Sequence, residues 1–298
     1  MLNKLNQVVP ALSLMIIALA TMTNAHAHRA WMLPSSTVIE DKDPWVTIDA
    51  AISNDLFDIN YHPLKLDGLV ITGPDGKQVA PANALTGRLR STFDIKLDLP
   101  GTYKASIVTH GVMASYTLNG EMKRWRGSEE AFATALPAGA QDVKATRVSR
   151  RLETLVSSGN PNDTVFKTSG VGLEWVPLTH PNDMRAGEKA TWRFLLDGKA
   201  ASNQSFSLVP GGVRYRGVLG EIRHTTDANG EISFTLPAAG MYFLNTSWPQ
   251  LKVATASVAA SATASTTASA TQSATAAQRP EPPARRVSYA ATVEVLPQ

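Results

Sequence analysis

The most continuous hydrophobic segment of the chain lies near its N-terminus. It covers residues 8–20 (VVPALSLMIIALA), follows a polar start that contains Lys4, and precedes small residues around Ala25 and Ala27. A positive start, an apolar core and an A-x-A-like site are the three parts of a secretory signal peptide. The run is also shorter than the ~20 apolar residues that a membrane-spanning helix needs. We therefore expect residues 1–27 to hold a signal peptide, cleaved after Ala25 or Ala27, and the mature protein not to span a membrane.

After this segment, apolar and polar residues alternate in short stretches that predict β-strands. The first group of predicted strands covers residues 45–51, 69–72, 93–97 and 101–109. Glycine, proline and aspartate separate these stretches at intervals of about ten residues, which is typical of an antiparallel sandwich. We predict an immunoglobulin-like β-sandwich over residues 28–118.

The alternation returns in the second half of the chain. Its predicted strands cover residues 191–196, 205–209, 232–236 and 241–245, and the sequence at 226–230 (TDANG) predicts a hairpin turn. The final segment, 287–296 (VSYAATVEVL), also alternates. Residues 171–298 are therefore predicted to form a second immunoglobulin-like or transthyretin-like sandwich. The Ala/Ser/Thr-rich residues 254–286 interrupt it and cannot bury enough apolar surface to fold, so we expect a disordered insertion.

Residues 119–170 show a different pattern. Ser128 is followed by two glutamates, as at a helix start, and Val143, Val148, Leu152 and Leu155 have mostly helical spacing. We predict a connector with one helix, and we interpret the basic stretch 144–151 (KATRVSRR) as the solvent-facing side of that helix.

Composition narrows the possible chemistry. Hydrophobic residues make up 43% and charged residues 18% of the chain, which is typical of a folded protein. The absence of cysteine excludes thiolate metal sites and cysteine nucleophiles, so metal ligands must come from histidine, carboxylates, methionine or the backbone. No hydrolase, zinc-protease or nucleotide-binding motif is present, and we predict that the protein is not an enzyme. The net charge of +3 comes without a long basic block, so nucleic acid is not an expected partner.

The processing site itself carries candidate metal ligands, in the sequence TNAHAHRAW at 23–31. Cleavage after Ala25 exposes His26-Ala27-His28, whose amine, two amides and third-position imidazole form a planar nitrogen set that suits Cu(II) or Ni(II). Cleavage after Ala27 makes His28 the first residue. Its amine and ring are then two arms of a histidine brace, which needs another histidine from the fold. We prefer the first site because it keeps both histidines, and the second remains open.

Few side chains elsewhere can complete such a site. His62 follows an acidic and aromatic loop and is the first choice, and His110 at the end of an apparent strand is the second. The predicted metal ligands are therefore His26, His28, His62 and His110. Met32, Asp55 and Asp58 are weaker candidates, whereas we expect His180 to shape a turn and His224 to face solvent.

Several segments resemble a known family. They are AHAHRAWMLPS at 25–35, WVTIDAAISNDLF at 45–57, LEWVPLTHPND at 173–183, TDANGEISFTLPAAGMYFL at 226–244 and the closing YAATVEVL. Together these segments resemble the DUF4198 family, which is described as periplasmic components of cobalt or nickel uptake systems related to the NikM type in Gram-negative bacteria. The resemblance implies a periplasmic location and a membrane metal transporter, of ABC/ECF type or TonB-linked, as partner.

Three hypotheses follow. The first is a non-enzymatic periplasmic protein that binds nickel, cobalt or copper through its processed N-terminus and delivers it to an uptake system. The second is an envelope interaction module in which the histidines are idle. The third is a copper oxygenase, because a histidine brace on a β-sandwich can activate oxygen.

The processing step is directly testable. We expect mass spectrometry of the exported protein to show His26 or His28 as its first residue, because the signal-peptide pattern places cleavage there. A chain that still carries Met1, or that begins well beyond Arg29, would contradict terminal metal ligation.

Overall fold

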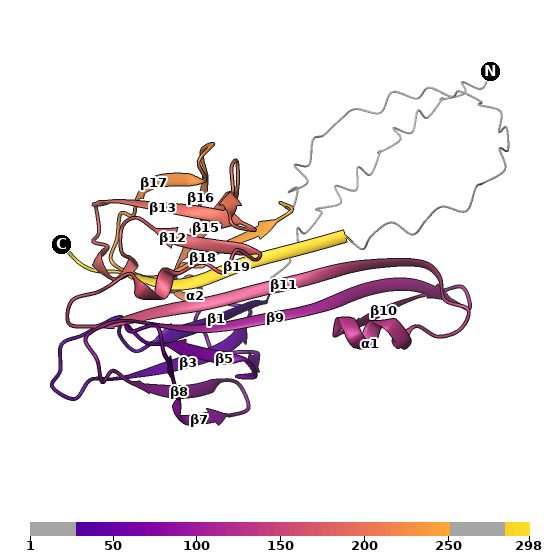
Figure 1. Cartoon of the computed structure of the whole chain (residues 1–298), viewed down its shortest axis with the longest axis horizontal. Helices are drawn as coiled ribbons and strands as arrows, with labels where there is room; N and C mark the ends of the chain where they lie inside the picture. Colours follow the sequence, from indigo (N-terminus) through magenta and orange to yellow (C-terminus); the bar gives the residue numbers. More distant parts are fainter. Residues whose placement is uncertain (1–27, 251–283) are drawn as a thin grey trace, which may run out of the picture.

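The computed structural model of the protein describes residues 28–250 and 284–298 (Figure 1). The predicted signal peptide, with His26, and residues 254–283 of the predicted insertion lie outside the described residues. Within the described ranges, no helix is long and apolar enough to cross a membrane.

The largest of the three β-sheets runs through the centre of the molecule. Its main order is β16-β15-β18-β19-β11-β9-β5-β6, with β10 paired to β9 and β2 paired to β11. Its ten strands are β2 (Val38–Ile39), β5 (Leu69–Thr72), β6 (Gln78–Val79), β9 (Gly101–Leu118), β10 (Glu121–Gly127), β11 (Gln141–Ser158), β15 (Ser205–Pro210), β16 (Ile222–Thr225), β18 (Gly240–Trp248) and β19 (Ala284–Val295). Strands from both halves of the chain are thus hydrogen-bonded into one sheet.

Two smaller sheets complete the sandwiches. A five-stranded sheet contains β1 (Arg29–Pro34), β3 (Trp45–Ser53), β4 (His62–Pro63), β7 (Ala82–Thr86) and β8 (Ser91–Lys96). A four-stranded sheet contains β12 (Leu173–Pro177), β13 (Lys189–Leu196), β14 (Lys199–Ala200) and β17 (Glu231–Thr235). The helical segments are α1 (Glu129–Ala135), α2 (Val213–Arg216) and the 3₁₀ turns η1 (Thr164–Phe166) and η2 (Pro181–Asp183).

The two small sheets cover opposite faces of the large one and enclose separate cores. Side chains alternate between the faces of a strand, so consecutive apolar residues of β11 point into different cores. Leu155 belongs to the core beneath the four-stranded sheet, with Trp192 and Phe194. Leu152 and Val156 belong to the core beneath the five-stranded sheet. The prediction of an all-β protein built from packed sheets is confirmed, while its division into two domains stays a prediction.

The helix predicted from Val143 to Leu155 is wrong, because this stretch is strand β11. Its apolar residues lie three to five apart, which resembles a helical stripe. In fact only the second half of this strand, from Leu152, is buried on both faces, whereas Val143 is exposed. The helix start at Ser128 is real: its hydroxyl accepts a hydrogen bond from the Ala131 amide at 3.2 Å, but the helix ends at Ala135.

The hairpin predicted around 226–230 is also wrong. The turn exists, since the Asp227 carboxylate accepts hydrogen bonds from the Asn229 and Glu231 amides at 2.8 Å each. However, β16 pairs with β15 in the large sheet, whereas β17 pairs with β13 in the four-stranded sheet. The turn therefore carries the chain from one layer of the sandwich to the other.

The closing strand is confirmed and holds a central position. β19 pairs antiparallel with β18 and parallel with β11. It begins at Ala284, so the last three residues assigned to the insertion belong to the strand.

A buried group of charges lies where β19 meets β11. The hydroxyl of Tyr289, which is fully buried, donates to Glu153 Oε2 at 2.5 Å. Arg151 and Lys104 approach the other oxygen of this carboxylate at 3.4 and 3.8 Å. Burial, and then the negative charge of Glu153, raise the pKa of Tyr289 well above its usual value. The tyrosine therefore stays protonated and acts as a donor.

We expect Tyr289→Phe to lower the free energy of unfolding by about 1.5–3 kcal/mol, because it removes a hydrogen bond to a buried charged group. Tyr242→Phe is the matched control, since the Tyr242 hydroxyl donates to a neutral acceptor, the Ala238 carbonyl, at 2.8 Å. Its loss should cost only about 0.5–1.5 kcal/mol. Equal losses in urea unfolding of the two variants would contradict this account.

Candidate functional site

The first described residues are fixed by a buried tryptophan. Trp31 in β1 has no exposed surface, and its indole N–H donates to Ser53 Oγ at 2.7 Å. The Ser53 hydroxyl in turn donates to the Asp55 carbonyl at 2.6 Å. Phe57, which has a positive φ of 66°, packs edge-on against Trp31 at 5.6 Å between ring centroids. This chain of contacts joins the start of β1 to the loop between β3 and β4.

That connection brings two of the predicted ligands together. His28 stacks on Tyr61, with ring centroids 4.0 Å apart and an interplanar angle of 19°. Tyr61 also contacts His62, at 4.2 Å and 61°. The two imidazoles are therefore no farther apart than the sum of these two distances. Both histidines are exposed, so His28, Tyr61 and His62 form an aromatic cluster at the surface.

Register explains why these residues meet. β3 lies between β1 and β4, and its residue Ile52 pairs with Ala30 on one side and with His62 on the other. Tyr61 was not among the predicted site residues, although its position directly before His62 in the sequence was the available signal. The weaker candidates contribute little: Met32 is fully buried in the core, and the Asp55 carboxylate accepts a hydrogen bond from Asn60 at 3.2 Å.

The cluster supplies two histidine side chains. Within the described part of the chain, no three His, Asp or Glu side chains converge as a metal site would require. A third protein ligand would thus have to come from the backbone or from residues before His28. An N-terminal amine at His28 would meet this need without a further side chain.

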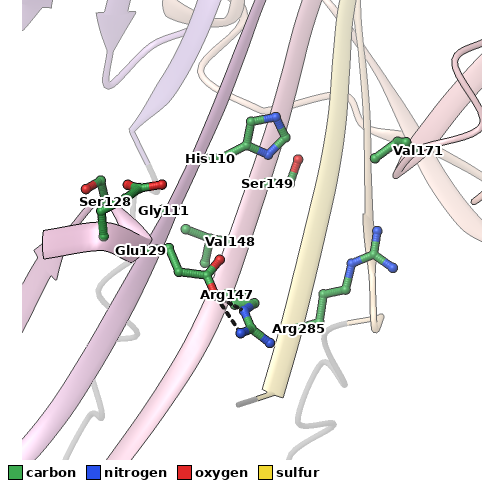
Figure 2. A pocket seen from close by; sticks show the side chains of 10 residues that line it. His110, Gly111, Ser128, Glu129, Arg147, Val148, Ser149, Val171 and Arg285 are labelled. Atoms are coloured by element: carbon green, nitrogen blue, oxygen red, sulfur yellow. Dashed lines mark hydrogen bonds and ion pairs between the residues drawn. The ribbon is translucent and has the colours of Figure 1, made fainter. Parts of the chain in front are cut away.

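His110 lies elsewhere, on β9 opposite Ser149 of β11. It lines a pocket of about 290 Å³ between α1, the large sheet and Val171 (Figure 2). A neighbouring pocket of about 250 Å³ shares His110, Ser149 and Val171. Neither pocket is lined by His28 or His62, so the structure does not bring His110 into the N-terminal cluster.

The charges around the His110 pocket are mostly paired with one another. Arg147 binds Glu129 at 2.5 Å, as drawn in Figure 2, and Arg285 binds Asp197 at 2.6 Å. The Arg285 guanidinium and the Gly172 amide hold the pKa of the Asp197 carboxyl below its usual value. These pairs leave the pocket electrically balanced, which favours a packing role over the binding of a charged ligand.

The remaining histidines have structural positions. His180 shapes a turn, as expected: its Nδ1 accepts from the Asn182 amide at 3.1 Å, and its Nε2 lies 3.0 Å from Thr102 Oγ1. His224 does not face solvent, because it packs against Phe206 and Phe234 and its Nε2 is buried without a partner in the described structure. Burial lowers the pKa of both imidazoles.

Solved structures resemble this fold only distantly. A DUF4785 family protein from Legionella pneumophila is 10% identical with a TM-score of 0.20, and the match covers 72% of this chain and half of that one. The D0-D1 domain of intimin is 11% identical with a TM-score of 0.21, covering 89% and 97% of the two chains. A two-domain fibronectin type-III segment from chicken tenascin is 13% identical with a TM-score of 0.17, covering 74% and 90%. No curated protein matches the sequence.

The fold defines the molecule as an all-β protein of packed sheets. Its sequence matches the model of DUF4198, a domain of unknown function, over residues 25–250. The chain therefore belongs to the DUF4198 family. The match begins at the histidine pair and ends before β19, so the closing strand lies beyond the matched region.

Burial of His180 and His224 predicts a pH-dependent stability. Both imidazoles have lowered pKa values in the folded state, so the unfolded chain takes up protons first as the pH falls below about 6.5. The contribution of these two histidines to the free energy of unfolding should thus be constant above that pH. Below that pH, the free energy of unfolding should decrease.

We expect His224→Phe to remove part of this decrease, and to raise stability at neutral pH by about 1–3 kcal/mol, because it also eliminates a buried polar atom without a partner. Urea unfolding of both proteins between neutral and acidic pH measures the effect. An unchanged pH slope in the variant would show that His224 is not buried as described.

Proposed function

We propose that this protein binds a divalent transition metal ion, nickel, cobalt or copper, at its processed N-terminus and delivers it to a membrane uptake system. In this proposal the protein is exported to the periplasm, and the metal is its cargo. His28 and His62 are the side-chain ligands, and the amine released by cleavage is the third nitrogen donor.

The contact of both His28 and His62 with Tyr61 is the observation that supports this proposal. The two histidines are separated by more than thirty residues in sequence, and they meet because β1 and β4 pair with the same part of β3. Imidazole and amine nitrogens are suitable ligands for nickel, copper and cobalt. Two exposed imidazoles beside a chain terminus provide a set that a metal ion can enter and leave from solvent, as a delivery protein requires.

The arrangement favours cleavage after Ala27 more than the sequence alone did. With His28 as the first residue, its amine and imidazole can chelate one ion while His62 supplies the third nitrogen. With His26 as the first residue, the terminal trio would be complete without His62. The two schemes therefore differ in whether the fold takes part in binding.

A copper oxygenase would use the same three donors. A histidine brace also needs two imidazoles and a terminal amine, and the contact of both His28 and His62 with Tyr61 is the observation on which this alternative rests as well. It predicts that the copper-loaded protein produces hydrogen peroxide when a reductant is present. A delivery protein should hold copper without this reaction.

Calorimetric titration with Ni(II), Co(II) and Cu(II) tests the proposal. We expect the mature protein to bind at least one of these ions, and a form with one extra N-terminal residue to bind it much more weakly, because its amine is displaced from the cluster. His62→Ala should lose at least the roughly 10- to 100-fold in affinity that disturbing the surroundings of a metal site causes.

His110→Ala is the matched control, since His110 is also exposed but lies in the separate pocket. It should bind metal as the unchanged protein does. Equal affinity of the extended and mature forms would refute ligation by the terminal amine. If the protein begins at His26 and its His62→Ala variant keeps full metal affinity, binding would instead be assigned to His26-Ala27-His28 alone.

A further inference from the structure

Strands β9, β10 and β11 extend beyond the two cores as an arm, with β10 and α1 at its far end (Figure 1). Residues that pair across neighbouring strands share a face of the sheet, so the register sorts the side chains of the arm. Glu129 of α1 binds Arg147 and thereby marks the side on which the helix lies, here called the helix face. The opposite side is called the open face.

The register places five cations on the open face. Arg124 and Lys144 both pair with Ser115 of β9, and Arg126 pairs with Met113. Farther along, Arg286 of β19 pairs with Val148, and Arg150 pairs with Thr109. The five cations therefore lie on three strands, β10, β11 and β19. They are Arg124, Arg126, Lys144, Arg150 and Arg286.

Cations on the helix face have carboxylate partners. Lys123 binds Glu121 at 2.5 Å, and Arg147 binds Glu129 at the same distance. Arg285 binds Asp197 at 2.6 Å. Positive charge on this side is balanced within the molecule.

The five cations of the open face have no carboxylate within ion-pair distance among the described residues. The one side-chain contact recorded for Arg126 is with the sulfur of Met113, at 3.7 Å. Asp142, at the far end of the arm, accepts a hydrogen bond from Thr117 at 3.4 Å. Partial desolvation, followed by repulsion from Arg126 and Arg286, lowers the pKa of Arg150. The Arg150 guanidinium is therefore close enough to those of Arg126 and Arg286 to be repelled by each.

Between these cations the surface is uncharged and partly apolar. The residues of β9 on this side include Thr109, Gly111 and Met113. Met113 is 38% exposed, and Met122 on the same face is 73% exposed. The open face therefore combines cations that lack carboxylate partners with two exposed, flexible methionine side chains.

We propose that the open face of the arm docks on an anionic lipid surface, where its cations contact the phosphate groups of the headgroups and its methionines enter the interfacial layer. A bilayer presents phosphates over an extended area, which matches cations that are spread over three strands. Arginine and lysine gain about 1 kcal/mol each near such a surface.

The distribution of aromatic residues favours lipid over nucleic acid. Tyr116 and Trp125 of the arm pair with Lys123 and Ala114 and so lie on the helix face, where Trp125 packs against Phe132 at 5.2 Å. Single-stranded nucleic acid is held by base stacking on aromatic side chains. On the open face, the described strands of the arm present cations and methionines, and their aromatic side chains lie on the helix face.

Co-sedimentation with vesicles tests this assignment. We expect the protein to bind vesicles of equal parts phosphatidylglycerol and phosphatidylcholine more strongly than vesicles of phosphatidylcholine alone, with affinity falling as salt increases. The variant Arg126→Gln, Arg150→Gln, Arg286→Gln should lose about 100-fold in affinity for the anionic vesicles.

The matched control is Lys123→Gln, Arg147→Gln, Arg285→Gln, which removes the same charge from the helix face. It should bind anionic vesicles within a few fold of the unchanged protein, and circular dichroism should show both triple variants folded. Met122→Ser should weaken binding to anionic vesicles as well. Equal losses in the two triple variants, or equal binding to neutral and anionic vesicles, would overturn the proposal. Tighter binding to single-stranded DNA than to anionic vesicles would also do so.

Discussion

The position of β19 between β18 and β11 is the constraint on which the rest of the structure depends. Nine of its twelve residues pair with β11 and nine pair with β18, and the strand thereby joins the two halves of the chain into one sheet. Its two faces serve different cores. Tyr289 and Val293 lie in the core beneath the four-stranded sheet, while Ala290 packs against the other. Without this strand, β18 and β11 would each expose an unpaired edge.

Much of the architecture could be predicted from hydrophobic alternation, and the failures share a physical cause. Strands with one buried face, such as β3 and β8, show the period of two that marks a strand. β11 is exposed in its first half and buried on both faces in its second half, so its apolar residues lose that period and imitate a helix. The turn at Asp227 has the composition of a hairpin, but local sequence cannot show that its two flanking strands belong to different sheets.

Only part of the candidate site could be predicted from the sequence, because contacts between distant segments cannot be seen in local sequence. His28 and His62 could be named from their residue types and positions, but their proximity depends on the pairing of β1 and β4 with β3, a contact between distant segments. His110 was the second choice for a ligand from the fold, yet strand order places it on the large sheet beside α1. The basic residues of the stretch 144–151 are a further example. In a helix they would form one solvated surface, whereas the strand divides them between a balanced side and an unbalanced one.

The pairing of Trp248 with Val287 means that β18 ends beside the start of β19. The covalent link through residues 251–283 therefore reduces the entropy of the unfolded chain, whereas the ladder bonds to β11 and β18 position the strand. A break in the backbone there would leave every ladder bond of β19 intact. The last strand could then be supplied as a separate peptide, so this molecule is a natural candidate for division into two complementary fragments.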